Sequence, residues 1–80
     1  SEIEYIEMDV YPNPANNVLN IKSHLKYIGT NYSVIDNSGK VVLTGIIRSN
    51  LTILNTEVLS EGIYLLSVGD NIKRKFIVIR

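Results

Sequence analysis

Short runs of β-branched and aromatic residues, separated by clusters of turn-forming residues, recur along this 80-residue chain. The turn clusters return about every 8–12 positions, and no long stretch sustains the i, i+3, i+4, i+7 spacing of an amphipathic helix. This spacing is typical of short antiparallel strands packed as a sandwich or a barrel. Because 80 residues suffice for one hydrophobic core and no more, the sequence predicts a single small all-β domain.

Seven such runs can be distinguished. The second alternates cleanly, since Leu19 and Ile21 point to one face while Asn20 and Lys22 point to the other. The runs cover residues 3–10, 18–23, 32–36, 40–47, 51–54, 63–68 and 72–80. Seven strands are the minimum for an immunoglobulin-like fold, so we expect a seven-stranded immunoglobulin-like antiparallel β-sandwich.

The segments between the runs have the composition of turns and connections. Two prolines fix φ and remove two backbone donors, which predicts a rigid turn outside any sheet over residues 11–17. The segment from Asp36 to Gly39 predicts a tight hairpin turn, because Asp caps its own turn and Gly tolerates positive φ. Residues 24–30 are expected to form a polar connection. Leu59 lies in the loop that follows the fifth run, and its side chain is expected to be buried in the core.

The sequence lacks the groups from which most catalytic and metal sites are built. It has no cysteine, and its one histidine, His24, falls in the polar connection, where a solvated surface role is expected. The carboxylates fall in predicted turns or near the start of the chain and do not suggest the facing pair of a glycosidase. Gly-rich phosphate loops and calcium-loop spacing are absent from the sequence. We therefore expect no enzyme activity, no cofactor, no metal and no small-molecule substrate.

Charge and hydropathy argue against two further classes of partner. Eight Lys and Arg residues balance eight Asp and Glu residues, which disfavours nucleic-acid binding. No apolar run reaches the roughly 18–20 residues of a transmembrane helix, so no transmembrane segment is expected.

A glycan-binding platform would need exposed aromatics, whereas Tyr32 and Tyr64 are expected in the core and Trp is absent.

Four features remain, and they follow one another in a defined order. Each has a simple structural explanation: a rigid two-proline turn, a hairpin glycine, a buried leucine before a strand, and a charged edge strand that resists aggregation. Their combination is far more specific than any one of them. The features are Tyr11-Pro12-Asn13-Pro14-Ala15, the hairpin around Gly39, the block Leu59-x-x-Gly62-Ile63-Tyr64, and the basic ending that contains Lys73, Lys75 and Arg80.

With these features, the chain closely resembles the type A C-terminal sorting domain of the type IX secretion system of Bacteroidetes bacteria. The resemblance covers residues 10–80 as a single sorting domain, and residues 1–9 are then a linker or a first edge strand. The residues that carry the resemblance, and that we expect to form the recognition motif, are Tyr11, Pro12, Asn13, Pro14, Ala15, Gly39, Leu59, Gly62, Tyr64, Lys73, Lys75 and Arg80.

The resemblance implies a targeting function. Such domains end longer precursors, are recognised in the periplasm by the outer-membrane translocon, and are usually removed by a sortase-like cysteine protease. The implied partners are the translocon, that protease and a covalently linked N-terminal passenger, which is secreted or held at the cell surface. We expect the last strand to be recognised by strand addition or by carboxylate contacts to Lys73, Lys75 and Arg80. Cleavage is expected near or before residues 1–9.

Two other interpretations stay open. An immunoglobulin-like accessory module that binds carbohydrate or protein for a secreted enzyme would show a row of exposed aromatics on one sheet face. A purely structural spacer would persist in the mature secreted protein.

Overall fold

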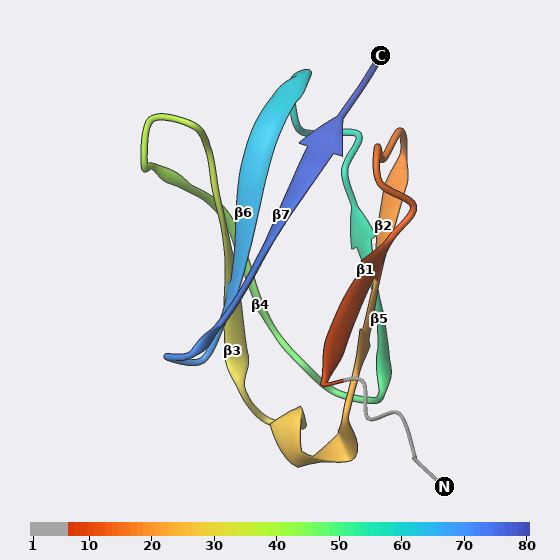
Figure 1. The fold of residues 1–80 in the computed structure, drawn as a ribbon, viewed down its shortest axis with the longest axis vertical. Coiled ribbons are helices and arrows are strands. Elements are labelled where there is room, and N and C mark those ends of the chain that lie inside the picture. Colours follow the sequence, from red (N-terminus) through yellow and green to blue (C-terminus); the bar gives the residue numbers. More distant parts are fainter. Residues whose placement is uncertain (1–6) are drawn as a thin grey trace, which may run out of the picture.

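The computed structural model describes residues 7–80, and these form two antiparallel sheets packed face to face (Figure 1). The three-stranded sheet has the order β1-β2-β5 and contains β1 (Met8–Tyr11), β2 (Val18–Ser23) and β5 (Leu51–Asn55). The four-stranded sheet has the order β4-β3-β6-β7 and contains β3 (Asn31–Ile35), β4 (Val41–Ile46), β6 (Gly62–Val68) and β7 (Ile72–Val78). The predicted seven-stranded immunoglobulin-like sandwich is confirmed.

The two ends of the strand pattern differ from the prediction. Residues 3–6 of the predicted first strand lie outside the described residues, and β1 extends to Tyr11, which pairs with Asn20 instead of opening the turn. At the other end, β7 stops at Val78 although the predicted run continues to residue 80. The reason is that Val78 already pairs with Gly62, the first residue of β6, so β6 offers no partner to the two residues that follow.

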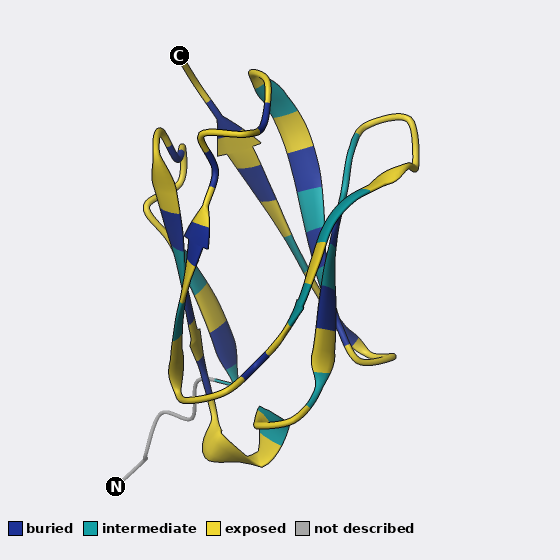
Figure 2. Cartoon of the chain, turned by 180° about the vertical axis from the view of Figure 1, so that it is seen from behind, coloured by how far each residue is buried: buried dark blue, intermediate teal, exposed yellow. Residues whose placement is uncertain are grey.

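The core lies between the sheets, where the buried bands of the facing strands meet (Figure 2). Alternation places Leu19 and Ile21 inside, as predicted, and Tyr32 and Leu59 are also buried. The ring of Tyr64 stacks on Phe76 with the ring centroids 5.7 Å apart. The other buried apolar residues are Met8, Ala15, Val34, Ile47, Leu54, Leu66, Val68, Ile72 and Val78.

The predicted hairpin turn joins β3 to β4 and is closed by Asp36. Its carboxylate Oδ1 accepts hydrogen bonds from the backbone N–H groups of Ser38 and Lys40, at 2.9 and 3.0 Å, and from the Ser38 hydroxyl at 2.7 Å. These bonds, that of the Ser38 hydroxyl above all, lower the pKa of Asp36. Gly39 has φ +90°, a left-handed conformation that glycine adopts at little cost.

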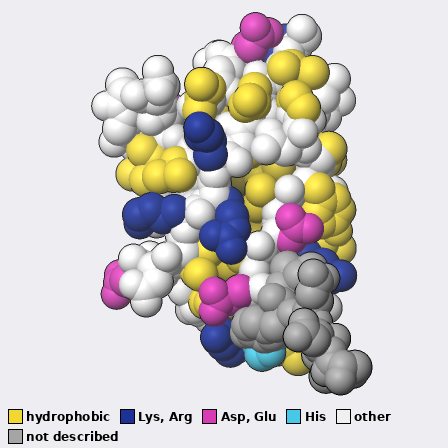
Figure 3. Space-filling view, viewed as in Figure 1, with side chains coloured by type: hydrophobic (Ala, Val, Ile, Leu, Met, Phe, Trp, Pro, Cys, Tyr) yellow, Lys and Arg dark blue, Asp and Glu magenta, His cyan; other side chains and the backbone are white. Residues whose placement is uncertain are grey.

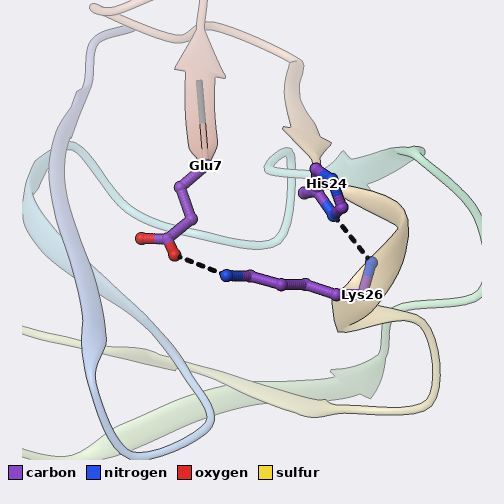
Figure 4. A network of polar contacts seen from close by, with 3 residues as sticks. All are labelled: Glu7, His24 and Lys26. Carbon is purple, nitrogen blue, oxygen red and sulfur yellow. Dashed lines mark hydrogen bonds and ion pairs between the residues drawn. The ribbon is translucent and has the colours of Figure 1, made fainter. Parts of the chain in front are cut away.

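The connection between β2 and β3 contains a short 3-10 helix, η1 (Leu25–Tyr27), which its polar composition did not predict. His24 caps the helix, because its Nδ1 accepts a hydrogen bond of 3.0 Å from the backbone N–H of Lys26. The Lys26 ammonium also lies 3.1 Å from the carboxylate of Glu7, so this turn is tied to the segment that precedes β1 (Figure 4). Hydrogen bonds from Tyr27 and Lys26 lower the pKa of Glu7.

Candidate recognition site

The two-proline segment lies beside the end of β7 and is bonded to it. The Ala15 N–H donates to the Ile77 carbonyl at 2.7 Å, and the Ile79 N–H donates to the Ala15 carbonyl at 2.9 Å. The side-chain oxygen of Asn13 accepts from the Ile77 N–H at 3.0 Å. Ala15 thereby forms a parallel bridge with Val78 and is fully buried. The prediction that residues 11–17 lie outside any sheet is wrong at two positions: Tyr11 belongs to β1, and Ala15 bridges to Val78. Both residues can pair because only the prolines lack an N–H.

Arg80 folds back onto the same end of the sandwich. Its guanidinium donates to the backbone carbonyls of Asn16, Thr56 and Leu59. Its backbone N–H donates to the Glu61 carboxylate at 3.2 Å. We call this set of contacts the Arg80 clasp. One guanidinium binds three carbonyls from two loops, so it joins the two-proline segment to the loop between β5 and β6.

The loop between β5 and β6 is also held from within. Thr56 is fully buried, and its hydroxyl donates to the Asn16 carbonyl at 3.0 Å. The Leu59 side chain enters the core, while its N–H donates to the Thr56 carbonyl at 3.0 Å. The Tyr64 hydroxyl donates to the Ser60 carbonyl at 2.7 Å. The predicted Leu59 and Tyr64 thus fix the loop that the Arg80 clasp holds from the other side.

The structure joins three of the four predicted features by hydrogen bonds at one end of the sandwich. Gly39 belongs to the hairpin turn at the same end (Figure 1), where it lines a shallow groove with Tyr64 and Lys75. Lys73 lies further back along β7, opposite Ser67. Tyr11, although it precedes Pro12 and Pro14, presents an exposed side chain at the end of β1.

Sequence reasoning missed three members of the site: Asn16, Thr56 and Glu61. Asn16 and Thr56 contribute backbone carbonyls to the clasp, and no side-chain pattern marks a carbonyl in advance. Burial of the polar Thr56 follows from its bond to the Asn16 carbonyl, which is satisfied only once the two loops meet.

β7 is an edge strand, but part of its outer edge is already used. The backbone N–H and C=O of Ile77 bond to Asn13 and Ala15. Arg74 donates to the Met8 carbonyl at 3.3 Å and to the Lys73 carbonyl at 3.0 Å. Alternate residues of a strand direct their backbone groups to the same edge, so Lys73 and Ile77 share the edge that a new strand would need. Strand addition to β7 would have to displace these contacts.

Residues 7–80 bring together no group of three or more His, Cys, Asp or Glu side chains able to hold a metal ion. No helix in this part of the chain has the length and apolar character to cross a membrane.

The fold and this site define a small immunoglobulin-like β-sandwich whose distinctive residues hold one end of the domain together. The sequence model of the secretion system C-terminal sorting domain family matches residues 9–80, and the chain therefore belongs to that family. This confirms the resemblance to type IX secretion sorting domains. The domain is a sorting signal, and its family is not a family of enzymes.

Among solved structures, the chain is similar to part of PorZ, a bacterial surface component of the type IX secretion system of Porphyromonas gingivalis. The TM-score is 0.76 and the sequence identity is 20%, so the similarity concerns the fold alone. The match covers 91% of this chain and 11% of that of PorZ. No curated protein matches the chain in sequence.

Proposed function

We propose that this domain directs a longer precursor through the outer-membrane translocon of a type IX secretion system, and that a sortase-like protease then removes it. Membership of the sorting-domain family supports the proposal. The observation that carries it is the convergence of three family motifs on one end of the sandwich, where the Ala15 bridge and the Arg80 clasp fix the course of β7. A receptor that reads a folded domain needs such a rigid landmark.

The arrangement of the described chain fits this role. β1 starts at the end of the sandwich opposite to Arg80 (Figure 1). A passenger joined ahead of β1 would then lie far from the end of the sandwich that contains the motifs. The passenger would cross the periplasm and reach the cell surface or the medium while the motif end stays accessible to the translocon.

The experiment is an export assay. The 80-residue chain is fused behind a periplasm-targeted reporter in a bacterium that has a type IX secretion system. We expect the reporter at the cell surface or in the medium, and mass spectrometry should find it without residues 10–80. The same fusion in a strain whose translocon is inactivated should stay in the periplasm. Retention of a folded, intact fusion in the secreting strain would contradict the proposal.

The binding-module alternative predicts a row of exposed aromatics. Tyr32, Tyr64 and Phe76 are buried, and Tyr27 packs against the core. Of the aromatic side chains in residues 7–80, that of Tyr11 alone is exposed, and a single side chain does not form a row. The structure therefore offers this alternative no specific support.

A further inference from the structure

The two sheets differ in how their charges are balanced. In the three-stranded sheet, Asp9 lies directly opposite Lys22. The strands of the four-stranded sheet contain no Asp or Glu, while β7 carries Lys73, Arg74 and Lys75 in succession. Lys and Arg side chains accordingly gather over the face that β7 crosses (Figure 3). This positive charge is not compensated within its own sheet.

Apolar side chains lie exposed beside these charges. Ile63 of β6 and Ile77 of β7 are directly opposite each other on the outer face, and they are 47% and 40% exposed. Lys75 follows on the same face of β7, opposite the half-buried Leu65. Side chains that lie directly opposite on neighbouring strands contact each other, so the two isoleucines form a continuous apolar patch. We call Ile63, Leu65, Lys73, Lys75 and Ile77 the β6–β7 face.

A shallow groove borders this patch. It runs between the hairpin turn and β6, and it is lined by Asp36, Asn37, Gly39, Ile63, Tyr64, Leu65 and Lys75. A Cβ added at Gly39 would meet no atom within 4 Å, so the turn leaves the groove open at that point. The Asp36 carboxylate is occupied by the hydrogen bonds of its own turn.

We propose that the β6–β7 face docks on a protein partner whose surface carries an apolar patch bordered by carboxylates. The inference rests on the proposed sorting function and specifies the chemistry of the partner. Two exposed isoleucines, flanked by lysines in a sheet whose strands carry no carboxylate, match such a surface in both hydrophobicity and charge. Arg80 is not part of the face, because the clasp engages its guanidinium. Binding to an anionic membrane generally relies on a cluster of about four to eight Lys and Arg residues, whereas the β6–β7 face contributes Lys73 and Lys75.

The test uses the reporter fusion with two double variants of the face. Lys73→Glu with Lys75→Glu reverses the charge, and Ile63→Ser with Ile77→Ser removes the apolar patch. The matched controls lie on the three-stranded sheet: Lys22→Glu for charge, and Leu51→Ser with Ile53→Ser for exposed apolar area. We expect each face variant to lower the amount of exported reporter by about tenfold, while the controls are exported like the unmodified fusion.

Four outcomes separate the possibilities. Normal export of both face variants would overturn the docking inference and leave the sorting function intact. Equal loss of export in the control variants would also overturn it, because the effect would then not be specific to the face. If the unmodified fusion is not exported, the sorting function fails, and the docking inference fails with it. Co-sedimentation of the unmodified chain, but not of the face variants, with phosphatidylglycerol vesicles would assign the face to a membrane and overturn the protein partner.

Folding of the face variants is monitored in the same cells. Lys73 and Lys75 are exposed, so charge reversal leaves the core unchanged, and the retained fusion should resist limited proteolysis as the unmodified fusion does. A drop in export that occurs only together with protease sensitivity in both double variants would attribute the effect to unfolding and overturn the inference.

Discussion

The ring of Tyr32 in β3 lies directly over Gly45, its cross-strand partner in β4. A Cβ added at Gly45 would come within 2.4 Å of both Cζ and Oη of Tyr32, a separation that real Cβ atoms do not show. Tyr32 is itself buried, so a shift of its ring would alter its packing against the core. Gly45 is therefore required by close packing, not by a turn or a positive φ.

Gly45→Ala should lower the free energy of unfolding by about 1–3 kcal/mol, as overpacking of a core typically does. Urea denaturation followed by circular dichroism measures the change. Gly62→Ala is the matched control, because a Cβ there would meet no atom closer than 3.8 Å. Its effect should stay within about 0.5 kcal/mol.

A double-mutant cycle identifies the cause. In a Tyr32→Leu background the ring is gone, so the cost of Gly45→Ala should largely disappear. An undiminished cost in that background would show that the ring is not responsible.

Asp36 should make the stability of the domain dependent on pH in the acid range. Hydrogen bonds to its carboxylate lower its pKa in the folded state, so folding favours the ionised form. This contribution is fully present above the ordinary carboxyl pKa of 3.8 and is lost as the pH falls through the lower, folded-state pKa. The melting temperature of the unmodified chain should therefore exceed that of Asp36→Asn near pH 7, and the difference should shrink in strong acid.

Comparison of the two chains isolates Asp36 from other carboxylates. The pKa of Glu7 is also lowered, but Glu7 is present in both chains and its contribution cancels in the difference. A melting-temperature difference that stays constant from neutral to strongly acid pH would exclude the assigned role of the Asp36 carboxylate.

The Arg80 clasp should stabilise the domain through the geometry of the guanidinium. Arg80→Ala should lower the free energy of unfolding by about 1–2 kcal/mol, since hydrogen bonds from a charged donor to three carbonyls are lost. Arg80→Lys should recover only part of this loss, because an ammonium lacks the planar fork. Thermal unfolding measures both variants. Full recovery with lysine would mean that charge alone, and not the fork, holds the loops.

Asn13 should act on one identifiable backbone group. Asn13→Ala removes the acceptor of the Ile77 N–H, so we expect a loss of about 1 kcal/mol and faster hydrogen exchange at that amide. Asn17→Ala serves as the control, because Asn17 accepts a hydrogen bond from the Thr56 N–H through its backbone carbonyl, which survives the change. Unchanged exchange at Ile77 in the Asn13 variant would rule out the bond.

The strands were predictable because their pattern is local. β2 has the predicted bounds, and burial alternates in β6 as its sequence indicates, with Tyr64, Leu66 and Val68 inside. The hairpin turn was equally predictable, since Asp36 and Gly39 act on neighbours within four residues. Gly45 was not, because its constraint comes from a ring on another strand.

The sequence by itself determined where the strands run and which side chains face the core. Side chains alternate between the two faces of a strand, so consecutive residues suffice to show the pattern. The tertiary structure alone decided that Ala15 joins β7 and that Arg80 reaches Asn16, Thr56 and Leu59. Those contacts join residues 64, 24 and 21 positions apart in the chain and end on backbone carbonyls. Every residue has a carbonyl, so only the folded arrangement of the loops selects which of them accept the guanidinium.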